Sequence, residues 1–242
     1  MAGLLMLAVW EGAWRAGWID PLFFSGPTAV AGALWRLVVS GAIIPNYLTT
    51  LSAAALGLVL AVATGGVAGI VYGLSPAVRQ VAGPYLAALN ATPRVATIGL
   101  LVVWLGLGIG VRVALVTISA FFPVFFNTAE GVRGRDASLD RVARVYGCNR
   151  REWFTSILLP HTLPYLLTGT RLALGRALVV VVIAEIFVGS LGGIGYFIIN
   201  AGQQFQSANV LAAACLMAAT GWALSTGLER LGIWLTPWHD GR

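Results

Sequence analysis

The sequence DRVARVYGCNRREWFTSILLP, residues 140–160, is a polar and arginine-rich insert in a chain that is otherwise strongly apolar. Arginine is frequent within the insert and just before it. The six arginines of this region are Arg133, Arg135, Arg141, Arg144, Arg150 and Arg151. A polar insert between apolar segments is typical of a docking element on a membrane protein, and a plain cytoplasmic loop is the alternative.

The composition requires a lipid bilayer around most of the chain. Hydrophobic residues make up 58% of the 242 residues, charged residues make up only 10%, and the mean hydropathy is +0.85. A water-soluble domain of this size could not cover so much apolar surface. We therefore predict an integral membrane protein. The net charge of +6 gathers in the basic insert and near the chain ends, which indicates topology rather than a nucleic-acid partner.

The residue types needed for catalysis or metal binding are scarce. All fifteen Lys and Arg positions are arginine, which excludes both a P-loop lysine and a Schiff-base lysine. Cys148 and Cys215 lie in different environments, and His161 and His239 offer no spacing for a pair of metal ligands. The sequence therefore predicts a protein that is not itself an enzyme, with no cofactor and no metal in this chain.

Apolar segments long enough to cross a bilayer recur along the chain. A spanning helix needs about 20 mostly apolar residues, and such segments cover residues 2–19, 47–74, 83–107, 111–131, 163–188 and 208–235. The third is expected to begin at Gly83-Pro84 and is interrupted at Pro93. These segments predict an all-α, polytopic transmembrane helix bundle of about six spans, which forms one domain over residues 1–242.

Local patterns refine this topology. Glu11 and Arg15 are spaced for an ion pair in the first segment, for which a membrane anchor is favoured over a signal peptide. Gly65 and Gly69 have the small-residue spacing that lets helices pack closely in lipid. Residues 21–46 predict an amphipathic helix on the extracytoplasmic surface. Placing the basic insert in the cytoplasm, between the fourth and fifth segments, puts both termini there as well.

Ionisable residues within the apolar segments are candidates for a transport path. Arg94 lies beside the break at Pro93, where either a water-filled cavity or contact with lipid phosphates would satisfy it. Arg171, Arg176 and Glu185 share the fifth segment, but helix geometry keeps them from pairing with one another. Each must find a partner on another helix, in a water-filled path or in a second subunit. An arginine that faces such a path would favour an oxyanion.

A glycine-rich and apolar segment, residues 189–208, separates the last two spans. It is too rich in glycine for a straight helix and too apolar for an open loop, so we expect a re-entrant or outer gate segment. Gln203, Gln204 and Gln206 would offer hydrogen bonds there. A plain extracytoplasmic loop with an aromatic cluster is the alternative.

The spacing inside the basic insert resembles the EAA loop of permease subunits of ATP-binding-cassette importers, which reads E-A-A, three residues, G, nine residues, I-x-L-P. The matching residues are Ala143, Gly147, Ile157, Leu159 and Pro160. The glutamate position falls on Arg141, with Asp140 as the nearest acid, and Val142 replaces the first alanine. The resemblance implies a coupling helix, within a loop of about residues 132–162, that sits in a groove of the ATPase. Further coupling residues would be Arg144, Cys148 and Asn149.

The order of motifs along the whole chain resembles the permeases for nitrate, alkanesulfonate, taurine and bicarbonate. The matching pieces are Trp10-Glu11, Pro27-x-x-Val30, Trp104-Leu105-Gly106, Phe122-Pro123 with Asn127, residues 163–178, Ala184-Glu185, and Gly193-x-Gly195-Tyr196 with Asn200. The candidates for the substrate path are accordingly Arg94, Asn127, Arg176, Glu185 and Gln203.

This resemblance implies a type I importer in a bacterial inner membrane. Two permease subunits, here a homodimer, would stand side by side on two cytoplasmic ATPase subunits that bind ATP and Mg. An extracytoplasmic solute-binding protein would deliver a small solute, and the expected solute is an anion such as nitrate, sulfonate, taurine or bicarbonate. The alternatives are a secondary transporter or channel subunit that works without an ATPase, and a membrane-embedded enzyme, for which paired catalytic residues are missing.

Overall fold

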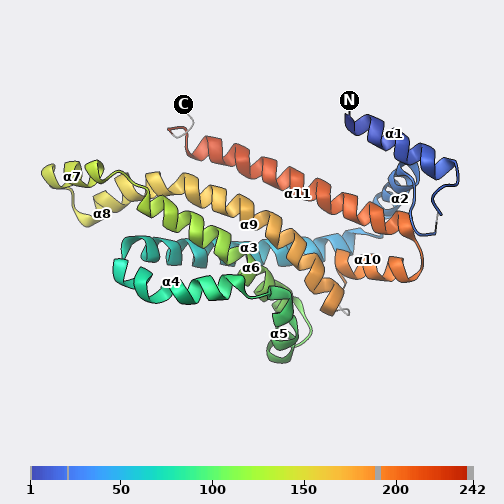
Figure 1. Ribbon diagram of the computed structural model, residues 1–242, viewed down its shortest axis with the longest axis horizontal. Coiled ribbons are helices and arrows are strands. Elements are labelled where there is room, and N and C mark those ends of the chain that lie inside the picture. Colours follow the sequence, from blue (N-terminus) through green and yellow to red (C-terminus); the bar gives the residue numbers. More distant parts are fainter. Residues whose placement is uncertain (1, 21, 189–191, 239–242) are drawn as a thin grey trace.

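The computed structural model describes residues 2–20, 22–188 and 192–238, and every regular element in these ranges is a helix (Figure 1). Residues 189–191 of the glycine-rich segment, and His239, lie outside them. The all-α prediction is confirmed for the described residues. In chain order the helices are α1 (Ala2–Arg15), α2 (Pro27–Val39), α3 (Ile44–Leu74), α4 (Pro76–Ala91), the 3-10 helix η1 (Arg94–Thr97), α5 (Ile98–Leu105), α6 (Ile109–Arg133), α7 (Ala137–Val145), α8 (Arg150–Trp153), the π-helix η2 (Phe154–Leu158), α9 (Leu159–Val188), α10 (Ile194–Gln203) and α11 (Ser207–Leu235).

Three of these helices, α3, α6 and α11, are long and apolar enough to cross a membrane. A fourth, broken crossing is formed if α4 is joined to the η1–α5 segment, and these two pieces meet at an angle of 88°. The sequence also predicts crossings for the 14-residue α1 and the 30-residue α9. By length and composition, the described chain therefore contains three to four candidate spans.

Glycines of α3 allow its backbone to lie directly against α6. A Cβ atom on Gly65 would lie 2.9 Å from the carbonyl oxygen of Phe121, and one on Gly69 would lie 2.7 Å from that of Phe125. Gly57 and Gly73 meet α6 in the same way, at Val116 and Val132. Because only glycine leaves room for this approach, the close packing that the sequence predicts for Gly65 and Gly69 is confirmed.

Helix α6 is the central helix of the bundle and packs along both α3 and α9 (Figure 1). In the most apolar stretch of α6, 56% of the residues are buried inside the molecule, whereas the corresponding share in α11 is 17%. Gly169 of α9 repeats the close approach, because a Cβ there would lie 2.9 Å from the carbonyl oxygen of Pro123. The core residue Val116 of α6 packs in one cluster with Ala177 and Val181 of α9. These contacts make α3, α6 and α9 one packed unit.

Helix α4 begins earlier than the sequence predicts. The hydroxyl of Ser75 accepts a hydrogen bond from the Val78 amide at 3.3 Å, and Pro76 occupies the first turn, a combination that starts helices well. Pro84 consequently lies inside the helix, so the predicted start at Gly83-Pro84 is wrong. The predicted break is present, because α4 ends at Ala91 and the chain bends before Arg94.

Glu11 forms the predicted ion pair within α1 and also joins α1 to α2. Arg15 donates to Glu11 at 2.6 Å, which confirms the pairing within α1. Glu11 also accepts hydrogen bonds from the backbone amide of Thr28 at 3.1 Å and from its hydroxyl at 2.8 Å. A carboxylate suits this place because the first turn of α2 presents unpaired amides. Helix α2 in turn packs on α11 through Val30 and Ala212.

Candidate functional site

The basic insert folds into two short capped helices. The Asp136 carboxylate accepts a hydrogen bond from the Ser138 amide at 2.7 Å and starts α7. At the other end, Gly147 has φ +70° and the Cys148 amide donates to the carbonyl of Ala143 at 2.9 Å. A second bond, from the Gly147 amide to Arg144, completes a Schellman ending, which requires a left-handed residue and so favours glycine.

The chain then re-enters a helix through a reciprocal cap. The Asn149 side chain accepts from the Glu152 amide at 2.9 Å, while the Glu152 carboxylate accepts from the Asn149 amide at the same distance. This capping box starts α8, which continues through η2 into α9. Helix α8 is therefore continuous with α9, because no loop separates them.

Asp140 connects the parts of the insert through its hydrogen bonds. Its carboxylate accepts hydrogen bonds from Trp153 Nε1 at 2.8 Å and Arg135 Nε at 3.2 Å, and the Arg135 guanidinium lies over the Trp153 ring. Partial burial alone would raise the pKa of Asp140, but these hydrogen bonds, with the charges of Arg135 and Arg144, outweigh it and lower the pKa below its ordinary value. Asp140 therefore remains ionised at neutral pH and joins α7 to α8, while Arg141 is exposed.

Helix α7 has one packed face and one uncovered face. Ala143 is 4% exposed and points inward, whereas Val145 and Tyr146 are 83% and 82% exposed. Leu139 and Val142 add to the exposed apolar surface. Cys148 and Leu159 are also exposed, Ile157 is half-buried, and the carbonyl of Pro160 accepts a hydrogen bond from Trp238 at 3.3 Å. The predicted coupling residues thus lie on one short projecting segment.

Arg94 lies at the bend between α4 and α5. It donates to the Asn90 side chain at 2.7 Å and its guanidinium stands 5.1 Å from the centre of the Phe122 ring. Among the described residues its Nε has no hydrogen-bond partner. Arg94 also lines a cavity of about 520 Å³ against α6. The exposed Arg176 of α9 is close enough to interact with it electrostatically.

Two further path candidates lie apart from this pair. Asn127 donates to the carbonyl of Pro123, one turn earlier in α6, at 2.8 Å, and it lines a hollow of about 390 Å³ that also contains Tyr72 and Glu130. Gln203 is exposed at the end of α10. Arg94 and Arg176 are therefore within electrostatic range of each other, whereas Asn127 lies on α6 beside another hollow and Gln203 lies at the end of α10.

Glu185 is the most buried of the path candidates, with 1% exposed. It faces Arg112 of α6 at 3.7 Å, and the hydroxyl of Thr50 of α3 lies 2.8 Å from each carboxylate oxygen. This confirms that Glu185 finds its partner on another helix. Arg112, which is 2% exposed, is not among the predicted path residues, and the sequence marks it only as an arginine inside an apolar segment.

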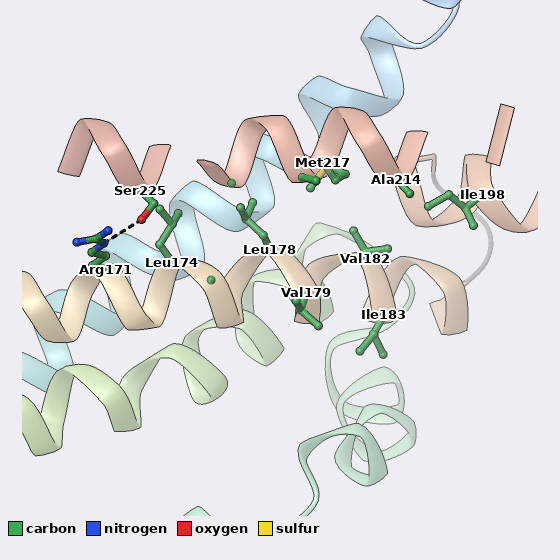
Figure 2. A pocket seen from close by; sticks show the side chains of 13 residues that line it. Arg171, Leu174, Leu178, Val179, Val182, Ile183, Ile198, Ala214, Met217 and Ser225 are labelled. Carbon is green, nitrogen blue, oxygen red and sulfur yellow. Dashed lines mark hydrogen bonds between the residues drawn. The ribbon is translucent and has the colours of Figure 1, made fainter. Parts of the chain in front are cut away.

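Arg171 also pairs across helices. It donates to the Ser225 hydroxyl at 3.0 Å and forms an ion pair with Glu229 at 2.9 Å, both on α11. These contacts close one end of an otherwise apolar groove of about 490 Å³ between α9 and α11, where Leu178 and Met217 face one another (Figure 2). In the described part of the chain no three His, Cys, Asp or Glu side chains are grouped to hold a metal.

Comparison with known proteins gives one consistent family. Residues 57–238 match the model of the binding-protein-dependent transport system inner membrane component. The chain is 32% identical to a putative aliphatic sulfonates transport permease protein of Bacillus subtilis over 99% of this chain and 88% of that protein. It is 30% identical to the taurine transport system permease protein of Escherichia coli, over 97% and 87%, and 29% identical to the nitrate import permease protein of Leptolyngbya laminosa, over 86% and 70%. The chain therefore belongs to the family of binding-protein-dependent transport system inner membrane components.

Proposed function

We propose that this chain is the permease subunit of an ATP-driven importer and that α7 is the helix through which the ATPase drives it. The observation that carries the proposal is the capped α7–α8 insert with its uncovered apolar face. Figure 1 places α7 and α8 at one end of the molecule, beyond the ends of α3 and α4. An exposed apolar patch rimmed by arginines is typical of a protein interaction site, so a soluble partner fits this face.

The proposed topology has six spans in a single permease domain, namely α1, α3, the α4–α5 pair, α6, α9 and α11. The arginine-rich insert and both termini lie in the cytoplasm of a bacterial cell, which follows the distribution of positive charge. Two such chains form a homodimer in the inner membrane. Two ATPase subunits, which bind the ATP and Mg, dock on the two inserts, and an extracytoplasmic solute-binding protein delivers the solute.

In this proposal the insert transmits force because it is stiff. Asp140 binds Arg135 on one side and Trp153 on the other, and Arg135 also donates to the carbonyl of Val132 at the end of α6 at 2.6 Å. A push on α7 therefore reaches α6 directly and α9 through α8. Closure of the ATPase dimer would thereby bias the packed helices between inward-facing and outward-facing states, which is rigid-body alternating access.

Gly147→Leu tests the docking role. Leucine at φ +70° costs about 1 to 2 kcal/mol in backbone strain, and this strain unwinds the end of α7 although the side chain itself meets no neighbour within 4 Å. We expect the ATPase subunits to be lost from the purified complex and solute uptake to be abolished, while the permease remains in the membrane. Pull-down of the ATPase and uptake into vesicles measure the two effects.

Gly17→Leu is the matched control. Gly17 has φ +75° and also has no neighbour within 4 Å of a Cβ, so the substitution adds the same strain far from the insert. It should leave ATPase association intact. Normal ATPase association and uptake in Gly147→Leu would refute the docking role of α7.

The proposed solute is a small oxyanion, because the named relatives carry sulfonates, taurine and nitrate. Arg94 and Arg176 are the proposed selectivity residues. Their two positive charges interact at the bend beside α6, and no ion pair of either with an acid occurs among the described residues. Two cations in an apolar region are costly unless an anion accompanies them. Asn127 and Gln203 complete the proposed path, whereas Glu185, predicted for the path from the sequence, is buried among α3, α6 and α9.

Arg176→Gln is expected to lower solute uptake about tenfold or more, the loss that follows from removing one charged hydrogen bond. The complete transporter in proteoliposomes would be tested with taurine, ethanesulfonate, nitrate and bicarbonate, after the binding protein has shown which of them it binds. Arg171→Gln is the matched control, because it removes an arginine of the same helix that pairs with α11. Equal losses of uptake in both variants would argue against a selective role for Arg176.

A further inference from the structure

The start of α10 is held by side chains from two other helices. Helix α10 begins after Gly193, and the first backbone amides of a helix have no partner within it. The Gly193 amide donates to the Asn46 side chain at 2.9 Å, the Ile194 amide to the Thr50 hydroxyl at 2.8 Å, and the Gly195 amide to the Glu185 carboxylate at 2.9 Å. Three consecutive amides are thus satisfied by α3 and α9.

Gly193 and Gly195 are required because the start of α10 lies very close to α9. A Cβ on Gly193, which has φ +109°, would overlap the Glu185 carboxylate, and a Cβ on Gly195 would overlap the carbonyl oxygen of Val182. Any larger residue would push α10 off α9. The structure shows residues 194–203 of the glycine-rich segment as a helix that is tightly packed at its start. The role of this segment as an outer gate stays a prediction.

Thr50 and Glu185 form one connected network. The Thr50 hydroxyl accepts from Ile194 and donates to the Glu185 carboxylate, so it links α10, α3 and α9 through a single atom. Arg112 brings the fourth helix, α6, and supplies the positive charge that a buried carboxylate needs. We call these residues the Glu185 clasp: Asn46, Thr50, Arg112, Glu185 and the amides of residues 193–195.

We propose that Glu185 is a positioning residue that fixes α10 to the packed unit of α3, α6 and α9, so that α10 moves with this unit during transport instead of opening as a separate flap. Opening α10 as a flap would be unfavourable because several hydrogen bonds would have to break at the same time. Opening α10 alone would take the acceptors away from the amides of residues 193–195, and each buried group left unpaired is costly. Thr50 and Glu185 would each lose one of their hydrogen bonds as well. The consequence for transport rests on the proposed function.

Thr50→Val and Thr50→Ser form the test pair. Valine has the shape of threonine without its hydroxyl, so it removes the link between α10 and Glu185, whereas serine keeps the hydroxyl. In the purified complex of permease and ATPase, hydrogen exchange at the amides of residues 194–198 is expected to be about 10- to 100-fold faster in Thr50→Val than in the wild type. Thr50→Ser should restore slow exchange, and exchange in α7 should not change.

The second part of the test measures how much solute is taken up per ATP hydrolysed. Thr50→Val should lower this ratio severalfold while basal ATP hydrolysis stays near the wild-type rate, and Thr50→Ser should restore the ratio. Equal exchange in the valine and serine variants, or fast exchange with an unchanged uptake ratio, would overturn the proposal. Failure of the proposed function would give a different result from failure of this proposal. The wild-type chain would then purify without any ATPase, and hydrogen exchange could still be measured on the chain alone.

Discussion

Gly69→Leu is expected to prevent the permease from accumulating in folded form. The first atom added would lie 2.7 Å from the Phe125 carbonyl oxygen and 2.8 Å from Cβ of Thr128. Backbone atoms cannot swing aside as a flexible side chain can, so α3 must move away from α6. Overpacking costs about 1 to 3 kcal/mol where side chains can adjust and more where they cannot, and separation of these two helices would also open the contacts at Gly65 and Gly73.

The measurement is the yield of monodisperse protein in mild detergent together with its melting temperature. Gly227→Leu serves as the control, since this α11 glycine is helical and has no neighbour within 4 Å of a Cβ. It should fold as the wild type does, because leucine is a better helix former than glycine. A yield and melting temperature for Gly69→Leu equal to those of Gly227→Leu would show that α3 and α6 do not pack as described.

Arg112→Leu is expected to be strongly destabilising by itself. It leaves Glu185 buried without its cation, and breaking a buried ion pair from one side costs roughly 3 to 5 kcal/mol. The effect should show as a large fall in melting temperature, because Glu185 is 1% exposed and water cannot replace the lost partner.

The double variant Arg112→Leu with Glu185→Leu should recover part of this loss. Two leucines leave no unpaired charge, and such replacements of buried pairs are often neutral in other proteins. Recovery should be incomplete here, because the Gly195 amide and the Thr50 hydroxyl lose their acceptor. A double-mutant cycle isolates this coupling. Additive losses from the two single variants would mean that Arg112 and Glu185 do not depend on each other.

The fold class and much of the local structure of the basic insert could be predicted from the sequence, because they depend on local rules. Apolar segments mark helices that lie in lipid, the spacing of Gly65 and Gly69 marks a face where another backbone comes close, and Gly147 marks a left-handed turn. Glu11 and Arg15 paired as expected, since four residues along a helix bring side chains to the same face. The start of α4 differs from the prediction because the Ser75-Pro76 cap begins the helix before Gly83-Pro84.

The partners of the buried charges were decided by the tertiary structure alone. Helix geometry could exclude pairing among Arg171, Arg176 and Glu185, but nothing along the chain indicates that Glu185 meets Arg112 or that Arg171 meets Glu229. Periodicity gives the face on which a side chain lies, whereas the facing helix depends on how the whole bundle packs. The sequence by itself therefore determined a helical membrane protein with a basic polar insert. Only the packing of α3, α6, α9 and α10 decided that Glu185 lies in a closed polar cluster, because a buried charge must be matched by groups from distant segments.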